Sequence, residues 1–207
     1  MFRTKVLDVS DKGNAGTVVT LEHELYEIGN STGNEISYCT ITEMPFYLGQ
    51  GNWGGPRGGK PPEYNPPDRK ATTMLTHEVP RTAHLLYRLN GDYNPLHADS
   101  EAAAEAGFDG VIMHGLYSWN VTCRLLMAEF TDRSATSLKE FRARFVKPVC
   151  PGDKLTIEAW VLDGASASTF PGWTEVRFQV KVNDNQLCLS HGRTLIKLRK
   201  ARLPSKI

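Results

Sequence analysis

Residues 115–130 read GLYSWNVTCRLLMAEF and form the longest periodic apolar stretch of the chain. Apolar side chains recur there every three or four positions, which is the spacing of one face of an α-helix. These side chains are Leu116, Trp119, Cys123, Leu126, Met127 and Phe130. The pattern predicts a long amphipathic helix with this stripe buried, and the simplest role of the stripe is core packing.

Alternating and β-branched stretches lie on both sides of this helix and predict strands. The expected strands cover residues 3–9, 17–28, 35–47, 72–79, 138–146, 154–162, 173–182 and 186–198. Two short helices are also expected, one over 81–89 and one over 101–106, the second with Ser100 as its N-cap. The fold class is therefore α+β, with an antiparallel sheet wrapped around one long central helix.

Residues 49–69 are rich in glycine and proline and predict a long loop. This loop is either a linker between two halves or a binding element, since long structureless loops in compact proteins are often functional. Arg57 suits the second role, because arginine binds phosphate and the surrounding glycines let the backbone approach a ligand. We divide the chain into an N-terminal part, residues 1–75, and a C-terminal domain, residues 76–207.

The composition excludes several classes of protein. The chain has 24 basic and 23 acidic residues, net charge +1, so neither nucleic-acid binding nor membrane-surface binding is indicated. No apolar run approaches the length that crosses a bilayer, and membrane insertion is not expected. The four cysteines are scattered without a C-x-x-C pair, which favours buried, reduced thiols inside a cell. The tail Ser205-Lys206-Ile207 differs from the peroxisomal signal Ser-Lys-Leu by one aliphatic residue, so we expect a peroxisomal location, or otherwise a cytoplasmic one.

Asp92 and His97 flank the turn formed by Asn94 and Pro95. Histidine is suited to proton transfer near neutral pH, and a neighbouring carboxylate raises its basicity. Asn94 is placed to orient either group through a hydrogen bond. The alternative is an ordinary turn in which Asp92 caps the backbone and His97 has no chemical role.

Gly115 stands where the predicted helix begins, so its amide is a free donor at the positive end of the helix dipole. That donor would stabilise an enolate beside a thioester, although a helix start can require glycine for steric reasons alone. A metal site built from His97, Asp99 and His114 is disfavoured because the spacing matches no common ligand motif, and no metal is expected. An acid, a base and an amide donor together suit the addition or removal of water at an activated carbonyl compound.

A signature runs through this region: Tyr87-x-Leu89-x-Gly91-Asp92-x-Asn94-Pro95-Leu96-His97-x-Asp99, then Phe108 and Ile112-x-His114-Gly115. It resembles the signature of the MaoC-like, hydratase-2 enoyl-CoA hydratases, in the form found in the eukaryotic peroxisomal multifunctional β-oxidation protein and its fungal relatives. The segment 51–57 is similar to the glycine-rich segment of that family, and residues 1–50 look like the later strands of its first repeat. The resemblance covers nearly the whole chain.

The resemblance implies a hot-dog fold, complete in residues 76–207 and partial before them. It implies reversible hydration of a trans-2-enoyl-CoA to the (3R)-3-hydroxyacyl-CoA, with water held by Asp92 and His97, Asn94 in support, and the Gly115 amide as oxyanion donor. The residues that would contact coenzyme A are Gly54, Gly55, Arg57 and His114. No cofactor is expected, because coenzyme A enters only as part of the acyl-CoA thioester substrate.

The sequence also departs from the family pattern. Ser100 stands where proline is usual, and the first repeat lacks its front half with its central helix. The exposed apolar strands should then be covered by a second subunit, so a homodimer is expected. Three alternatives stay open: a dehydratase of polyketide-type acyl thioesters, a hot-dog thioesterase, and a non-catalytic acyl-binding module. A thioesterase would need an acid on the long helix, where only Glu129 near the far end is available.

Overall fold

The computed structural model of the chain describes residues 1–29, 33–60, 62–162, 170–184 and 186–199. The chain forms two compact units, Met1–Pro62 and Glu63–Ile207. The first repeat was expected to end at residue 75, which lies within strand β5 (Thr73–Glu78) of the second unit. The assignment of the chain to one partial and one complete repeat stays a prediction.

The first unit is a four-stranded antiparallel sheet. Its strands are β1 (Phe2–Asp11), β2 (Gly16–Ile28), β3 (Glu35–Glu43) and β4 (Phe46–Leu48), and the 3₁₀ helix η1 (Gly13–Ala15) joins the first two. β2 lies between β1 and β3 and also pairs with β4. The single strand expected over 35–47 is thus two strands, and the break falls at Pro45, which has no amide hydrogen to donate to a ladder.

The first part of the glycine-rich loop is fixed to this unit by the carboxylate of Asp11. That carboxylate accepts hydrogen bonds from the amides of Gly13 (2.8 Å), Asn52 (2.9 Å) and Gly54 (2.9 Å). The Gly13 hydrogen bond is the main cause that lowers the pKa of Asp11. A Cβ at Gly51 would stand 1.9 Å from the carbonyl oxygen of Gly13, so only glycine fits there. This part of the loop is therefore an ordered element of its unit.

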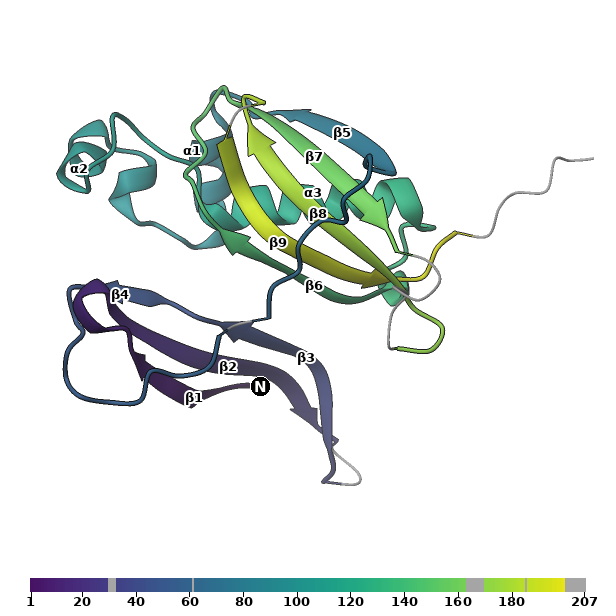
Figure 1. Cartoon of the computed structure of the whole chain (residues 1–207), viewed down its shortest axis with the longest axis horizontal. Coiled ribbons are helices and arrows are strands. Elements are labelled where there is room, and N and C mark those ends of the chain that lie inside the picture. The colour runs from purple at the N-terminus through teal and green to yellow at the C-terminus, as the bar shows by residue number, and fades with distance from the viewer. Residues whose placement is uncertain (30–32, 61, 163–169, 185, 200–207) are drawn as a thin grey trace, which may run out of the picture. The chain divides into compact units, whose positions relative to one another are not determined.

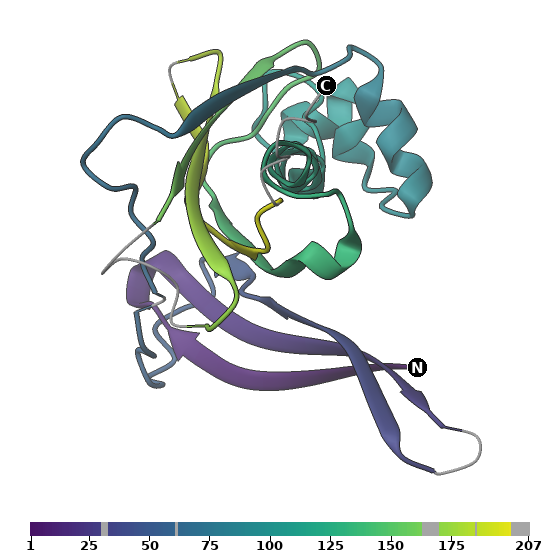
Figure 2. The same ribbon diagram turned by 90° about the vertical axis from the view of Figure 1, so that its right-hand side faces the viewer.

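The second unit is a five-stranded antiparallel sheet of order β5-β7-β8-β9-β6 with helices on one side (Figure 1). Its remaining strands are β6 (Leu138–Phe145), β7 (Lys154–Val161), β8 (Thr174–Val182) and β9 (Gln186–Ile196). Its helices are α1 (Ala83–Tyr87), α2 (Ser100–Glu105) and α3 (Gly115–Phe130), with the 3₁₀ helices η2 (Arg88–Asn90), η3 (Pro95–His97) and η4 (Ala135–Ser137). The curved sheet wraps around α3, which is seen end-on in Figure 2, and the predicted hot-dog fold is confirmed.

The core of this unit lies between α3 and the inner face of the sheet. On β8 the alternating side chains of Val176, Phe178 and Val180 are fully buried, and Leu126 of α3 packs in the same cluster. The predicted helix has the expected bounds, but part of its predicted stripe is wrong, since Leu116 is 57% exposed. The helix instead buries Ser118, Val121, Thr122 and Leu126.

Small polar residues on a helix can face a sheet when their hydroxyls have a partner, and Thr122 Oγ1 donates to the carbonyl of Ser118 at 2.7 Å. Periodicity gives the width of a buried face and cannot detect such residues.

Three further predictions need correction. The helix expected over 81–89 is α1 followed by the 3₁₀ turn η2, and it ends at Gly91 with φ 107°.

The N-cap of α2 is Asp99, and Ser100 is the first helical residue. The Asp99 carboxylate accepts from the amides of Glu101 (2.8 Å) and Ala102 (3.4 Å), which satisfies two of the unpaired donors at the helix start. The expectation that the cysteines are buried is also wrong for Cys39 and Cys150, which are exposed, although all four are free thiols. No helix among the described residues is long and apolar enough to cross a bilayer.

The second part of the loop, from residue 63 onward, is fixed to the outer face of the five-stranded sheet. The indole Nε1 of Trp160 donates to the carbonyl of Arg69 at 2.8 Å. The ring of Tyr64 lies about 5 Å from three guanidinium groups, those of Arg142, Arg177 and Arg193. The sheet is therefore covered on both faces, by α3 inside and by this segment outside.

Candidate active site

His97 ends η3, a short helix that the sequence builds from a proline turn. Pro95 takes the first helical position, where no amide is needed, and Asn94 Oδ1 accepts from the amide of Leu96 at 3.3 Å. The His97 side chain is nearly buried, and its Nδ1 lies 2.8 Å from the carbonyl oxygen of Ile112. A carbonyl only accepts, so Nδ1 carries the hydrogen and Nε2 of the neutral ring keeps a free lone pair.

Burial is the main cause that lowers the pKa of His97 below its ordinary value of 6.5. The neutral imidazole is therefore the dominant form near pH 7. A neutral ring with one nitrogen fixed by the main chain and the other free is the form that a general base requires.

Asp92 presents its carboxylate beside this ring. One side-chain ligand atom from each of Asp92, His97 and His114 lies within 4.8 Å of the other two. Two hydrogen bonds of about 2.8 Å can bridge a gap of up to about 5 Å through one water. The carboxylate and a ring nitrogen of His97 are therefore close enough to be bridged by a single water molecule, and the predicted catalytic role of the pair stays a prediction.

Asn94 supports the pair through its backbone. Its amide donates to Asp92 Oδ1 at 3.2 Å, and its own side chain caps the turn that carries His97. The hydrogen bonds of the Asn94 side chain thus go to the backbone and not to the two reactive side chains. A catalytic role for Asn94 stays a prediction.

His114 lies behind the pair. Its ring stacks on that of His97 with centroids 3.8 Å apart, and its Nε2 donates to the backbone carbonyl of Asp92 at 3.1 Å. It is only 2% exposed, and its Nδ1 has no hydrogen-bond partner among the described residues. His114 therefore contacts both His97 and the backbone of Asp92. Its predicted contact with the substrate stays a prediction.

The same three side chains are the described residues that could offer ligands to a cation. The metal triple considered from the sequence is not formed, because Asp99 caps α2. The nitrogen lone pairs of a histidine lie in the plane of its ring, and the two rings are stacked at 26° to each other, so these lone pairs converge poorly on one point. The geometry therefore favours a water site, and the expected absence of a metal stays a prediction.

A cavity of about 280 Å³ opens beside His97 and the start of α3. Gly115 and Ser118 line it from the helix, and Phe145, Pro148 and Leu189 line it from the sheet side. Because His114 is the N-cap, Gly115 is the first helical residue and its amide has no partner within the helix. A Cβ at Gly115 would stand 3.2 Å from Phe145 Cε1, so the steric reason for glycine is also present.

The sequence missed most of the residues that line this cavity, among them Ser118, Phe145 and Lys147. Ser118 is 3% exposed and stands three positions after Gly115, so helical spacing alone could have placed it on the same side. Phe145 is the last residue of β6 and Lys147 follows the strand, and neither carries a sequence signal of this position. Gly54, Gly55 and Arg57, predicted to contact coenzyme A, belong to the first unit, where Arg57 Nη1 donates to the carbonyl oxygen of Asp11 at 3.4 Å. Their role toward a substrate stays a prediction.

The chain belongs to the MaoC-like domain family, whose model, described as MaoC like domain, matches residues 61–184. Among curated proteins, it is 42% identical over 204 residues to the probable dehydratase NIT22 of Ajellomyces capsulatus, covering 95% of this chain and 53% of that protein. It is 35% identical to peroxisomal multifunctional enzyme type 2 of Drosophila melanogaster, over 75% of this chain and 26% of the relative. It is 34% identical to the enoyl-CoA hydratase ChsH3 of Mycobacterium tuberculosis, over 76% of this chain and 52% of the relative.

A solved MaoC-like dehydratase from Phytophthora capsici superposes with a TM-score of 0.79 at 26% identity, covering 95% of this chain and 64% of that one. These matches confirm the resemblance read from the signature. The chain spans about half of the curated relatives' length or less.

Proposed function

We propose that the protein reversibly hydrates a trans-2-enoyl thioester of coenzyme A to the (3R)-3-hydroxyacyl thioester. The observation that carries this proposal is that side-chain ligand atoms of Asp92 and His97 lie within 4.8 Å of each other, while His97 and Gly115, the first residue of α3, line the same cavity. The relatives named dehydratase and enoyl-CoA hydratase support the same class of reaction. No cofactor is part of the proposal.

Each side chain has one role in the reaction. His97 Nε2 removes a proton from the bound water while the Asp92 carboxylate accepts the second hydrogen and orients the oxygen. The hydroxide bonds to C3, the C2–C3 π electrons move toward the carbonyl, and the Gly115 amide donates to the resulting enolate oxygen. The imidazolium then returns its proton to C2, so one water is added across the double bond and the enzyme is regenerated.

Dehydration of a polyketide-type acyl thioester is the second candidate. It uses the same groups in reverse, and it is supported by the relative named probable dehydratase, which covers 95% of this chain. A thioesterase is less well supported, because Glu129, the acid on α3, lies near its far end and accepts from Thr73 Oγ1 at 3.5 Å.

The test follows crotonyl-CoA and longer enoyl-CoAs by loss of enoyl absorbance and by release of free thiol. Hydration without thiol release supports the proposal, thiol release indicates a thioesterase, and binding alone indicates an acyl-binding module. His97→Ala and Asp92→Asn should each lower turnover by about two to four orders of magnitude if both groups take part in proton transfer. Near-normal rates in both variants would remove the pair from the mechanism.

A homodimer is part of the proposal, with a second copy of this chain covering the apolar face of the first unit. Paired residues of an antiparallel sheet share a face, and Phe2 stands opposite Leu25 on the same side as Val6 and Ile41. These four side chains are between 49% and 64% exposed. An exposed group of apolar side chains on one sheet face is typical of a surface that another protein covers. Light scattering should give twice the mass of one chain, and a stable monomer would contradict the proposal.

A peroxisomal location is also proposed, and it is supported by the relative named peroxisomal multifunctional enzyme type 2. The tail 205–207 lies outside the described residues. A fluorescent protein fused ahead of residue 1 should colocalise with a peroxisomal marker and should lose that location when residues 205–207 are deleted. Diffuse fluorescence from the intact fusion would contradict this location.

A further inference from the structure

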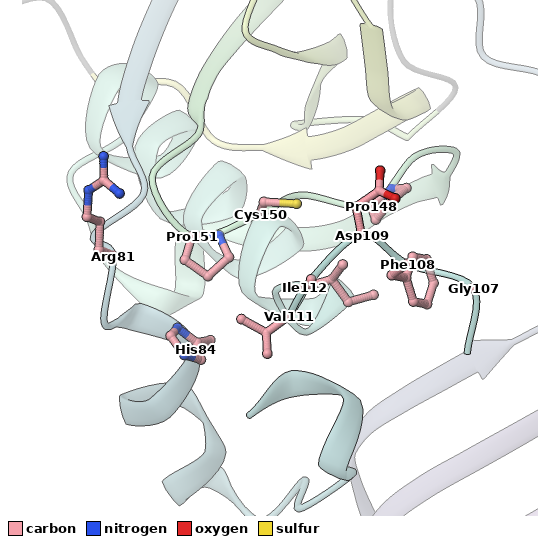
Figure 3. A pocket seen from close by; sticks show the side chains of 11 residues that line it. Arg81, His84, Gly107, Phe108, Asp109, Val111, Ile112, Pro148, Cys150 and Pro151 are labelled. Atoms are coloured by element: carbon pink, nitrogen blue, oxygen red, sulfur yellow. The ribbon is translucent and has the colours of Figure 1, made fainter. Parts of the chain in front are cut away.

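Tyr117, the third residue of α3, is held at both its hydroxyl and its ring, although it has no part in the mechanism above. Its hydroxyl is hydrogen-bonded to Nε2 of His77, on β5, at 2.8 Å. Burial is the main cause that lowers the pKa of His77 and raises the pKa of Tyr117, so both groups are neutral near pH 7. Neither side chain is among the described residues that line the catalytic cavity or the cleft of about 500 Å³ shown in Figure 3. The pair therefore fixes a ring and does not face either space.

The ring of Tyr117 begins a column of four aromatic rings that ends at the proposed base. It meets the ring of Tyr87 edge to face, with centroids 5.5 Å apart and an angle of 87° between the planes. The Tyr87 ring in turn lies 5.1 Å from that of His114, which stacks on His97 at 3.8 Å. Four rings in series therefore connect the first turn of α3 to the imidazole of His97.

Tyr87, the second ring of the column, depends on α3 for its orientation. Tyr117 and Asn120 stand three positions apart on α3 and so share a face of the helix. Nδ2 of Asn120 donates to the Tyr87 hydroxyl at 2.9 Å, which holds the tip of the ring. The edge of Tyr117 supports the face of the ring, in an arrangement that the ring quadrupoles favour. Removal of the Tyr117 ring would therefore leave Tyr87 free to tilt about its tip.

We infer that Tyr117 is a positioning residue for the proposed hydration, and that it acts through Tyr87 and His114 to hold the His97 ring in its reactive orientation. This inference rests on the proposed function. Among the described residues, the His97 ring makes one hydrogen bond, to the Ile112 carbonyl, and a single bond lets a ring rock about the bonded nitrogen. The stacked His114 ring prevents this motion only while Tyr87 supports it from behind.

The test compares two leucine substitutions on the same helix. Tyr117→Leu removes the edge contact with Tyr87. Trp119→Leu is the matched control, because Trp119 makes an edge contact of the same 87° angle with Phe141, which packs against the core. Both are assayed with crotonyl-CoA below their melting temperatures.

Tyr117→Leu should lower kcat about tenfold and leave KM unchanged. A displacement of about 1 Å in a reacting geometry costs about 100-fold, and the loss of one supporting ring should cause a smaller displacement. Tyr117→Phe keeps the ring and should recover most of kcat. Trp119→Leu should lower the melting temperature and leave both kinetic constants unchanged. In a chain that carries His114→Ala, which interrupts the column, Tyr117→Leu should have no further effect on kcat.

A second measurement needs no substrate. The NMR signals of the ring protons of His97 and His114 depend on the neighbouring rings, so they should shift in Tyr117→Leu and stay in place in Trp119→Leu. Unmoved signals in Tyr117→Leu would overturn the inference.

Three kinetic results would also overturn it. Equal losses of kcat in the two leucine variants would indicate a general packing effect, and a change confined to KM would indicate contact with the substrate. An undiminished effect of Tyr117→Leu in the His114→Ala chain would show that Tyr117 does not act through the column. If the unmodified protein hydrates no enoyl thioester, the proposed function fails by itself, and the NMR signals still decide whether Tyr117 positions His97.

Discussion

Replacing His114 by phenylalanine keeps a ring against His97 and removes the hydrogen bond to the backbone of Asp92. The bond itself is worth only about 1 kcal/mol. Its larger effect is on position, because the Asp92 loop is exposed and a displacement of about 1 Å in a reacting geometry costs about 100-fold in rate. We therefore expect kcat to fall by about 10- to 100-fold, with KM for the enoyl thioester little changed.

The same substitution has a second expected effect, on the pH profile. Burial lowers the pKa of His97 first, and the neighbouring His114 lowers it further. Loss of His114 should therefore move the acidic limb of kcat/KM to higher pH, toward 6.5, while burial still holds it below that value. The assay is hydration of crotonyl-CoA between pH 5 and 9.

His114→Gln is the matched control, because its side-chain amide can still donate to the Asp92 carbonyl. It should recover most of the lost kcat. A phenylalanine variant with normal kcat and an unmoved acidic limb would refute the reasoning, and so would a glutamine variant no better than phenylalanine at equal melting temperature.

Three further predictions follow from the geometry. In the unmodified protein the acidic limb of kcat/KM should lie below pH 6.5, because the pKa of His97 is lowered mainly by burial and activity is lost only as Nε2 becomes protonated; a limb above 6.5 would contradict this. Gly115→Ala should lower kcat by about tenfold through contact with the Phe145 ring, and Phe145→Leu in the same chain should restore part of the rate if the cause is steric. Asp11→Asn should destabilise the first unit at neutral pH, measured by amide hydrogen exchange in β1 and β2. The Asp11 pKa is lowered in the folded protein, so its stabilising effect is present above about pH 3.8 and is lost as pH falls; a difference that persisted at pH 2 would oppose this assignment.

The parts of the fold that depend on short stretches of sequence were predictable. The bounds of α3 follow from periodicity between Gly115 and Phe130, and every strand of the second unit follows from local alternation. The face that α3 buries depends on the sheet, which is why Leu116 was misplaced. Asp99 and Ser100 are almost equally good N-caps, so composition could not choose between them, and backbone geometry does.

Some residues of the candidate site could likewise be predicted from a short stretch of sequence, and others could not. Asp92 and His97 stand five positions apart on one rigid turn, so their pairing could be inferred from the sequence. His114 reaches them across 17 residues, and Phe145 enters from a strand, so neither position could be derived without the fold. A cleft of about 500 Å³ in the second unit combines residues from three separate segments, around Arg81, Phe108 and Cys150, which no local pattern connects.

One strip of chain, residues 112–115, supplies both the carbonyl that fixes the His97 tautomer and the amide at the start of α3. The distance between His97, the proposed base, and the Gly115 amide, the proposed oxyanion donor, is thus set by these four consecutive residues. The intervening segment 98–111, which contains α2, does not set it. Residues 98–111 contribute Gly107, Phe108 and Asp109 to the cleft of about 500 Å³. A change in the length or composition of residues 98–111 would therefore leave the spacing between the Ile112 carbonyl and the Gly115 amide unchanged.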